Sequence, residues 1–288
     1  MTTHLVTGAS GQLGQLAIDT LATLVDPASI IALVRSDEAA QRFTGRGIQV
    51  RRGDYNDPAS LADAFAGVDR VLFISGSEIG ARVPQHTAVI DAAKAAGVGF
   101  IAYTSVLDAA KSPMLIAREH AITERLLAES GIVHTVLRNG WYLENYLMGA
   151  GPALASGQLY GASGTGRVSP AAREDYALAA ALVLAGGHDG QVLELAGDES
   201  FTMADLAAAL ADISGKPVSY VDLPKEALQA GLVQAGLPEP LATILADSDA
   251  CAGQGSLFDD SHTLSRLIGR PTAPWRGFLA AALAPAQA

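Results

Sequence analysis

The sequence predicts a doubly wound α/β fold, in which helices cover both faces of a parallel sheet, together with a smaller, mainly helical cap domain. Apolar, β-branched runs alternate with segments of helical periodicity as far as Arg138. Gly8, Gly11 and Gly14 follow the first apolar run at intervals of three residues. From Thr202 onward helical periodicity dominates. Strands that alternate with helices form right-handed crossovers and a parallel sheet that is covered on both faces.

The first strand is expected at His4 to Thr7, and the three glycines lie where it turns into a helix over Leu13 to Leu24. Residues without a Cβ atom allow the unusual dihedrals of such a turn and the close approach of a pyrophosphate. The free N–H groups and the dipole of the helix then face the phosphates. The pattern predicts a Rossmann-type dinucleotide-binding loop formed by Gly8, Ser10, Gly11, Gln12, Leu13 and Gly14. The alternative is a glycine-rich turn that binds no ligand.

The other elements of the predicted sheet follow in order. Strands are expected at Ile30–Val34, Ile48–Val50, Val71–Ile74, Phe100–Tyr103 and Ile132–Leu137. Helices are expected at Asp37–Phe43, Ala59–Phe65, Pro84–Ala96 and Leu115–Glu129. These segments account for a sheet of six candidate strands with helical crossovers.

The pattern changes after Arg138. Trp141 to Met148 is rich in aromatic residues, and Gly157 to Gly166 has the glycine and small polar residues of a loop. Further helices are expected at Glu174–Leu184, Met203–Ile213, Lys225–Ala235, Leu241–Ala246 and Thr263–Ile268, and strands at Val192–Leu195 and Val218–Val221. We expect residues 1–150 to form the dinucleotide-binding domain, to which residues 174–196 return. Residues 151–173 and 197–288 are expected to form the smaller cap domain, which binds the substrate.

Composition excludes several classes of partner. The chain has 288 residues and a formal net charge of -11, so it repels nucleic acid and anionic lipid surfaces. Its single cysteine, Cys251, rules out an internal disulfide framework and reads as a small packing residue of a reducing cytosol. The apolar run Ala177 to Ala185 is too short to span a bilayer, and the N-terminus leaves no room for a signal core. We expect a soluble, cytoplasmic protein; the sequence leaves open whether it is a homo-oligomer.

Arg35 follows the second predicted strand. An NAD-specific site usually has an acidic residue here for the ribose 2′-hydroxyl, whereas arginine accommodates a 2′-phosphate. One such charge-assisted contact gives about a ten- to hundred-fold preference for NADPH over NADH. The alternative is a solvated arginine at the end of a strand.

Ligands of such sheets bind outside the carboxyl ends of the strands, where further candidates lie. Asp54 can accept the adenine amino group while Tyr55 flanks the ring, although Asp54 also suits a turn or helix cap before Pro58. The other expected cofactor contacts are small or hydroxyl-bearing residues. Ser75, Gly76 and Ser77 are expected near the second ribose and the diphosphate. Tyr103, Thr104 and Ser105 are expected near the nicotinamide. Serine and threonine also end strands for turn reasons alone.

One catalytic arrangement is missing from the sequence. Many short-chain dehydrogenases use a tyrosine with a lysine four positions on, and none of the seven tyrosines here has a lysine at that spacing. Carbonyl reduction without a positioned acid would lose roughly 10²- to 10⁴-fold in rate. A quinone or similar conjugated acceptor suffers less, because its oxyanion is stabilised by delocalisation and water can protonate it.

Trp141 and Tyr142 offer aromatic faces to a planar acceptor, and Asn139 offers a hydrogen-bond donor to its oxygen. The two aromatic residues suit equally an interface between cap and sheet. His120 and Glu124, at helical i, i+4 spacing, are a weaker candidate proton relay or a surface ion pair. Arg173 is a candidate for steering the cofactor, or for pairing with the acidic residues beside it. No spacing of ligands predicts a metal site.

Several stretches together resemble one family: VTGASGQLG, IALVR, GDYND, LFISGSE, FIAYTS, LRNGWYLENY, ELAGD and LFDDSHTLSRLIG. The chain resembles, nearly end to end, the bacterial type-2 NAD(P)H:quinone oxidoreductases of the NmrA-like atypical short-chain dehydrogenases, and less closely triphenylmethane dye reductase. The resemblance implies a bilobal protein that reduces quinones with NADPH and without flavin, with the cofactor in the cleft. It also implies that Asn139 to Tyr142 contact the nicotinamide or the acceptor in the cleft.

The loop Gly161 to Glu174 and the cap helices are less similar to the family, so the resemblance leaves the acceptor open. One alternative is a reductase of another conjugated acceptor, such as a dye. Another is a non-catalytic redox sensor that binds the dinucleotide and a partner protein.

Overall fold

The structure is a computed structural model that describes residues 1–78 and 80–284. The chain divides into two compact units, each built from several segments. Unit 1 comprises residues 1–109, 118–139 and 173–193, and unit 2 comprises residues 110–117, 140–172 and 194–288. This division assigns residues 140–150 to unit 2, whereas the sequence predicts them in the first domain. Helix α6, which starts at Leu143, packs against elements of unit 2 and thereby sets the division.

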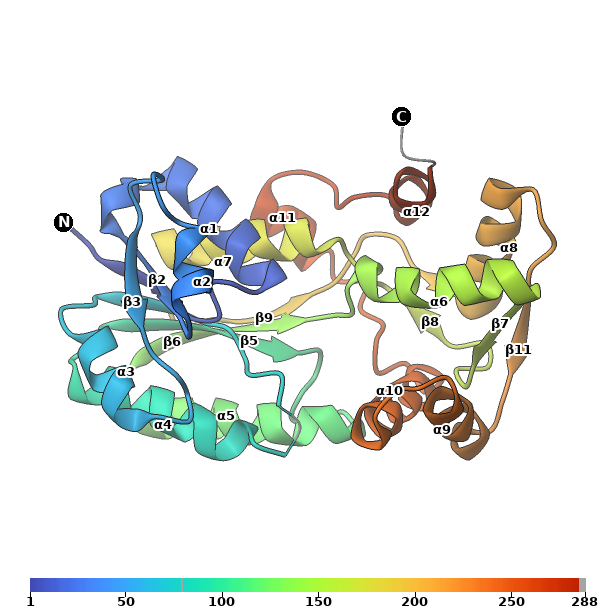
Figure 1. Ribbon diagram of the computed structural model, residues 1–288, viewed down its shortest axis with the longest axis horizontal. Coiled ribbons are helices and arrows are strands. Elements are labelled where there is room, and N and C mark those ends of the chain that lie inside the picture. Colours follow the sequence, from blue (N-terminus) through green and yellow to red (C-terminus); the bar gives the residue numbers. More distant parts are fainter. Residues whose placement is uncertain (79, 285–288) are drawn as a thin grey trace. The chain divides into compact units, whose positions relative to one another are not determined.

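Unit 1 is built around a parallel sheet (Figure 1). The strands lie in the order β3-β2-β1-β4-β5-β6-β9, and every pairing from β3 to β6 is parallel. The order reverses between β1 and β4, which is the topological switch point where such sheets bind ligands. The strands are β1 His4–Val6, β2 Ile30–Val34, β3 Gln49–Arg52, β4 Arg70–Phe73, β5 Phe100–Val106, β6 Val133–Asn139 and β9 Val192–Leu195. The predicted fold class is confirmed.

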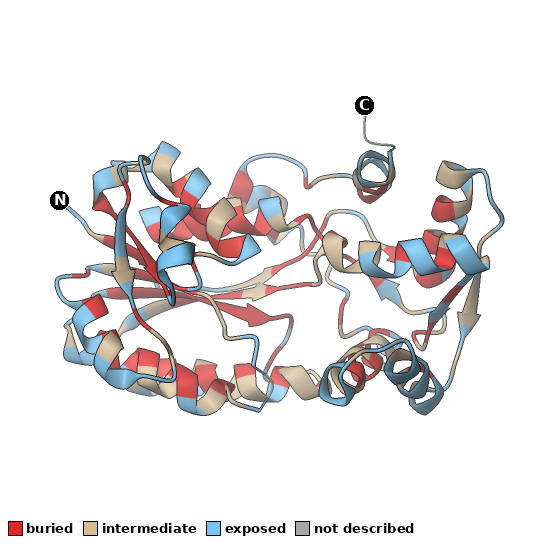
Figure 2. Ribbon diagram, viewed as in Figure 1, coloured by how far each residue is buried: buried red, intermediate tan, exposed pale blue. Residues whose placement is uncertain are grey.

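Helices cover both faces of this sheet (Figure 1). One face carries α1 (Gln12–Leu24) and α7 (Arg173–Ala185), which pack against each other. The opposite face carries α3 (Pro58–Phe65), α4 (Arg82–Ala95) and α5 (Leu115–Ser130). Figure 2 shows the central strands β1, β2, β4 and β5 and the inner faces of these helices as largely buried, whereas the edge strand β3 is mostly exposed. A 3-10 turn (Pro27–Ser29) precedes β2, and the short helix α2 (Asp37–Gln41) follows β2.

Unit 2 combines helices with two short sheets. Its helices are α6 Leu143–Ser156, α8 Met203–Ser214, α9 Lys225–Gln234, α10 Glu239–Ala252, α11 Thr263–Ile268 and α12 Trp275–Leu283. Strands β7 (Gln158–Gly161) and β11 (Ser219–Asp222) pair in parallel, and β8 (Arg167–Val168) pairs antiparallel with β10 (Phe201–Thr202). Cys251 is buried in α10, as expected of a packing residue, and burial raises the pKa of its thiol.

The structure corrects three expectations for the second half of the chain. The segment Gly157 to Gly166, expected to be a loop, contains β7, because Leu159 is buried against helices of unit 2. Helix α6 contains Gly149, Gly151 and Pro152. The sequence did not predict this helix, because glycine and proline disfavour helix interiors. Helix α10 starts two residues before the expected Leu241 and extends well beyond Ala246, to Ala252.

Candidate active site

The glycine loop after β1 has the geometry that a bound diphosphate requires. Gly8 has a φ of 58°, which favours a residue without a side chain. A Cβ atom at Gly14 would lie 2.3 Å from the carbonyl oxygen of Gly8, so no other residue fits there without moving the backbone. Helix α1 starts directly after Gly11 with neither a side-chain cap nor an acidic residue in its first turn. Its first N–H groups and its positive dipole end are therefore suited to an anion.

Side chains from the following elements hold this loop in place. The carbonyl oxygen of Ser10 accepts hydrogen bonds from Gln15 Nε2 at 2.7 Å and from Arg42 Nη1 at 3.3 Å. The Gly11 N–H group donates to the carbonyl oxygen of Gly8 at 3.0 Å. The loop is thus preorganised before any ligand arrives.

Arg35 lies at the end of β2, exposed to solvent, as the sequence predicts. Its guanidinium group lies 3.8 Å from the carboxylate of Glu78, which comes from the segment after β4. Glu78 is held in turn by Gln85 Nε2 at 2.8 Å. An acidic partner for Arg35 is therefore present, although it comes from a different strand end and the sequence analysis missed its role.

Asp54 and Tyr55 follow β3, and both have partners within unit 1. The Asp54 carboxylate accepts the N–H group of Asn56 at 2.9 Å, which is the turn arrangement considered as the alternative. The Tyr55 hydroxyl group contacts Thr7 Oγ1 and the carbonyl oxygen of Ile74, and its ring packs edge-on against Phe73. Burial raises the pKa of the Tyr55 phenol, so this group is neutral. Tyr55 thereby links the ends of β3, β1 and β4.

The segment Ser75 to Ser77 after β4 is positioned by buried side chains beneath it. The N–H group of Ser75 donates to Thr104 Oγ1 at 2.9 Å, and the N–H group of Gly76 donates to His86 Nε2 at 2.9 Å. A Cβ atom at Gly76 would lie 2.8 Å from the Gln85 side chain, so the backbone passes close to α4 here. This segment can therefore present a fixed backbone to a ligand.

His86 is completely buried, and its hydrogen bonds define its tautomer. Because the Gly76 N–H group can only donate, Nε2 must be unprotonated, and Nδ1 then carries the proton toward Thr123 Oγ1 at 2.8 Å. Burial, and secondly the positive charge of Arg82, lower the pKa of His86 to about 3. Arg82 itself donates from Nε to the carbonyl oxygen of Gly76 at 2.6 Å. His86 could not be identified from the sequence, because a histidine at a buried helical position gives no indication of its hydrogen-bond partner.

The structure corrects the expectations for Tyr103 and His120. The Tyr103 side chain is completely buried, and its hydroxyl group lies 2.8 Å from Nδ1 of His120, which is also buried. A cofactor contact of Tyr103 would have to use its backbone. Burial, and then the charge of Arg82, lower the pKa of His120 well below its usual value, so its ring is neutral. His120 therefore belongs to the core behind the strand ends.

Glu124, the expected second member of that relay, has different partners. Its carboxylate binds Arg138 through Nε at 3.0 Å and Nη2 at 2.7 Å, and it accepts the Ser105 hydroxyl at 2.6 Å. Glu124 and His120 thus do not form a pair, and Ser105 at the end of β5 is fixed by the ion pair. The expected proton relay is wrong in this respect.

Asn139 is the last residue of β6 and is 5% exposed. Its Oδ1 atom is buried and has no hydrogen-bond partner among residues 1–78 and 80–284. Buried polar atoms in native proteins are nearly always satisfied, so this oxygen is suited to a ligand that donates a hydrogen bond. The sequence analysis expected Asn139 to act as a donor, whereas the atom available here is an acceptor.

Trp141 and Tyr142 lie near the start of the second segment of unit 2 and are half-buried. The Trp141 carbonyl oxygen accepts the Ala171 N–H group at 3.3 Å, and Leu143 N–H donates to the Ala171 carbonyl oxygen at 2.9 Å. These bonds hold the two aromatic residues on the segment 170–172. Arg173 is the first residue of α7 in unit 1.

The described part of the chain contains no group of three or more His, Cys, Asp or Glu residues that could hold a metal ion. Within the same residues, no helix is long and apolar enough to cross a membrane. A cavity of about 800 Å³ lies at the amino ends of the strands, lined by His4, Arg70 and Phe100 among others, and thus at the opposite edge from the glycine loop.

The chain is similar in sequence to known NAD(P)H-dependent reductases over nearly its whole length. Quinone oxidoreductase 2 of Escherichia coli (strain K12) is 53% identical over 268 residues, which cover 93% of this chain and 94% of that protein. The NAD(P)H azoreductase of Xenophilus azovorans is 32% identical, over 95% of this chain and 96% of that protein.

Solved structures show the same fold. The NADPH complex of the E. coli NADPH-dependent quinone oxidoreductase superposes with a TM-score of 0.96 at 50% identity, covering 98% of this chain and 100% of that chain. The NADP(H) complex of Citrobacter sp. triphenylmethane reductase gives a TM-score of 0.91 at 38% identity, with coverage of 98% and 100%. The sequence profile of the NmrA-like family matches residues 2–270, and the chain belongs to this family.

Proposed function

We propose that this protein reduces quinones, or similar conjugated acceptors, with NADPH and without flavin or metal. The observation that carries the proposal is the glycine loop, in which Gly14 lies where no Cβ atom fits, at the carboxyl end of β1. The named relatives support the choice of reaction, since one is a quinone oxidoreductase and its NADPH complex has the same fold. NADH is expected to serve less well, because Arg35 favours a 2′-phosphate.

The residues at the strand ends fit a dinucleotide. The glycine loop, with Ser10, Gln12 and Leu13 at the start of α1, would hold the diphosphate. Arg35 would bind the 2′-phosphate. Asp54 and Tyr55 are proposed near the adenine, and Ser75 to Ser77, Thr104 and Ser105 near the second ribose and nicotinamide.

The unpartnered Oδ1 of Asn139 suits a carboxamide N–H group, and this orphaned atom is the feature that best fits a nicotinamide. Arg173 is retained only as a candidate for steering the anionic cofactor. When bound, NADPH supplies a hydride. The protein contributes a fixed backbone at Ser75 to Ser77 and a buried acceptor atom at Asn139.

Trp141 and Tyr142 are proposed to stack on the planar acceptor. Stacking and proximity would suffice for much of the rate, because the chain lacks a tyrosine with lysine four positions on and a quinone is easily reduced. The similarity to triphenylmethane reductase supports triphenylmethane dyes as a second acceptor class.

The test is NADPH consumption with a simple benzoquinone, followed by a panel of acceptors that includes a triarylmethyl dye. Saturable oxidation supports the proposed enzyme. Tight NADPH binding without turnover of any acceptor would instead support the redox sensor. Protein that is active only after a flavin or a metal is added would contradict the proposed cofactor requirement.

A further inference from the structure

The segment between β4 and α4 is held from inside unit 1 at one residue, Gly76. The Gly76 N–H group donates to His86 Nε2 at 2.9 Å, and the Gly76 carbonyl oxygen accepts Arg82 Nε at 2.6 Å. The preceding N–H group, that of Ser75, donates to Thr104 Oγ1 at 2.9 Å. Because each peptide group is planar, these bonds fix both peptide planes that meet at Gly76.

His86 and Arg82 lie one turn apart on α4, and both are supported by α5. Thr123 Oγ1 donates to the carbonyl oxygen of Glu119 at 2.9 Å, so this hydroxyl group accepts the proton of His86 Nδ1 at 2.8 Å. The carboxylate of Glu119 pairs with Arg82 Nη1 at 3.4 Å. The Arg82 side chain is 7% exposed, and His86 is completely buried. Close packing keeps such side chains in one rotamer, so they present a fixed acceptor and a fixed donor to Gly76.

This segment starts directly beside the glycine loop. Strands β1 and β4 are neighbours in the sheet, and the strand order reverses between them. A Cβ atom at Gly8 would lie 3.4 Å from the Cβ atom of Ile74, the residue before Ser75. The Ile74 N–H group also donates to Thr7 Oγ1 at 2.9 Å, which joins the ends of the two strands. The backbone that His86 fixes therefore lies at the switch point where a dinucleotide binds.

We propose that His86 is a positioning residue for NADPH, whose Nε2 atom orients the Gly76 peptide and thereby sets the affinity for the nicotinamide half of the coenzyme. This inference rests on the proposed function. The inward bonds occupy the N–H groups of Ser75 and Gly76, which leaves the hydroxyl groups of Ser75 and Ser77 for a ligand. Without an acceptor at Nε2, the Gly76 N–H group would have to turn outward to find a partner, and the segment would change its shape.

Two substitutions separate the roles of the two ring nitrogens of His86. The side-chain oxygen of glutamine can take the place of Nε2 and accept the Gly76 N–H group. Asparagine is shorter, reaches about as far as Nδ1 and leaves Gly76 without its acceptor. We expect His86→Asn to raise the Kd for NADPH by about 10- to 100-fold, and His86→Gln to restore it to within about threefold of the unmodified value. Equal losses of affinity in the two variants, or no loss in either, would overturn the proposal.

A fragment of the coenzyme tests where the effect arises. Adenosine 2′,5′-bisphosphate carries the adenine half of NADPH without the second ribose and the nicotinamide. Its Kd should change by less than about twofold in His86→Asn, because the Gly76 peptide is proposed to face the other half of the coenzyme. Equal losses of affinity for NADPH and for the fragment would show that the variant disturbs the whole edge of the sheet, and would contradict the positioning role.

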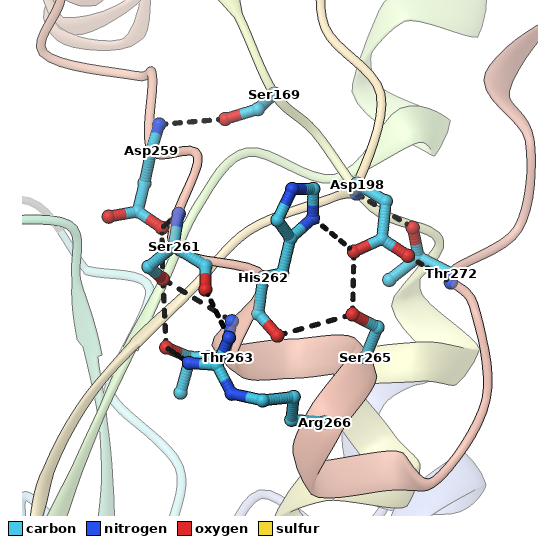
Figure 3. A network of polar contacts seen from close by, with 9 residues as sticks. All are labelled: Ser169, Asp198, Asp259, Ser261, His262, Thr263, Ser265, Arg266 and Thr272. Carbon is cyan, nitrogen blue, oxygen red and sulfur yellow. Dashed lines mark hydrogen bonds and ion pairs between the residues drawn. The ribbon is translucent and has the colours of Figure 1, made fainter.

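His262 in unit 2 provides a matched histidine control. Its Nδ1 atom lies 2.9 Å from Asp198 Oδ1, within a network of nine residues that all belong to unit 2 (Figure 3). Replacing it leaves the hydrogen bonds at Gly76 unchanged, so His262→Asn should keep the Kd for NADPH within about twofold of the unmodified value. A loss as large as that of His86→Asn would contradict a specific role for the bond to Gly76.

Nitrogen-15 NMR of the unmodified, ligand-free protein tests the geometry without any variant. Nε2 of His86 should be unprotonated and should show a scalar coupling to the Gly76 amide nitrogen across the hydrogen bond. A proton on Nε2 would overturn the proposal, even if His86→Asn does not fold. The proposed function fails by a different result: unmodified protein that binds no NADPH would refute it before any variant is compared, whereas tight NADPH binding with equal losses in His86→Asn and His86→Gln refutes the positioning role alone.

Discussion

Single residues at the strand ends carry much of the expected cofactor selectivity. Arg35 is exposed beside Glu78, and the two groups lie 3.8 Å apart, so the pair is weak and can open for a ligand. A 2′-phosphate would compete with Glu78 for the guanidinium group. A 2′-hydroxyl can instead donate to the carboxylate.

Replacing Arg35 by alanine should reduce the preference for NADPH over NADH by about ten- to hundred-fold, because the charge-assisted contact is lost. The ratio of steady-state kcat/KM values with NADPH and NADH measures this preference. Arg46→Ala is a matched control, since Arg46 pairs with Asp19 elsewhere on unit 1. An unchanged ratio in Arg35→Ala would remove this role from Arg35.

Replacing Glu78 by glutamine should act in the opposite direction. Removing a negative charge beside the 2′-phosphate should lower the Kd for NADPH about two- to fivefold, a modest effect because both groups are exposed. The Kd for NADH should stay constant or rise. Fluorescence titration with both coenzymes gives the two constants, and weaker NADPH binding would show that Glu78 serves only to place Arg35.

Residue type alone selected Arg35, the glycines and Asn139 as candidates, and the structure confirms the backbone geometry expected at Gly8 and Gly14. It did not predict Glu78, His86 or the separation of His120 from Glu124. Those depend on contacts between segments distant in the sequence, such as the Gly76 N–H group meeting His86 Nε2. The periodicity of a sequence indicates which face of a helix is buried, but it does not identify the hydrogen-bond partner that a buried side chain will have.

At the scale of elements, the first βα unit is tightly constrained by the close approach of Gly14 to Gly8. Gly14→Ala should lower the free energy of unfolding by about 1–3 kcal/mol and weaken NADPH binding at least tenfold, because the methyl group would overlap the Gly8 carbonyl oxygen. Urea denaturation and coenzyme titration measure the two effects. Gly231→Ala in α9, where an added Cβ meets nothing within 4 Å, should instead stabilise the protein slightly. Equal effects of both variants would refute the steric argument.

Elements with clear periodicity were predicted closely. Strand β2 and helix α11 have the expected bounds, and most other helices differ by one or two residues. Helix α6 was missed because glycine and proline lower helical propensity, whereas tertiary contacts of Leu143, Ala150 and Ala153 stabilise it. Short strands such as β8, which has two residues, carry no pattern long enough to detect.

At the scale of the whole molecule, buried histidines should make stability depend on pH. In the unfolded chain His86 has a pKa near 6.5, but in the folded protein it is about 3, so the unfolded state binds more protons between these values. The contribution of neutral His86 to the free energy of unfolding is therefore complete above about pH 6.5 and is lost as the pH falls toward 3. The shift corresponds to at most about 5 kcal/mol.

The pH dependence can be assigned with variants. His86→Gln should unfold more easily at pH 7 yet show a shallower fall in unfolding free energy between pH 6 and about 4, measured by urea denaturation. His188→Gln, at a half-buried position, should keep the slope of the unmodified protein. Equal slopes in the two variants would show that other groups dominate acid unfolding.

The order in which segments enter unit 1 has a consequence for synthesis. Helix α1 is made near the start of the chain, but its packing partner α7 ends only at Ala185. In a growing chain, the face of the nascent sheet that carries α1 therefore stays partly uncovered until roughly two thirds of translation is complete, so chaperones that bind apolar surface have a long interval in which to act.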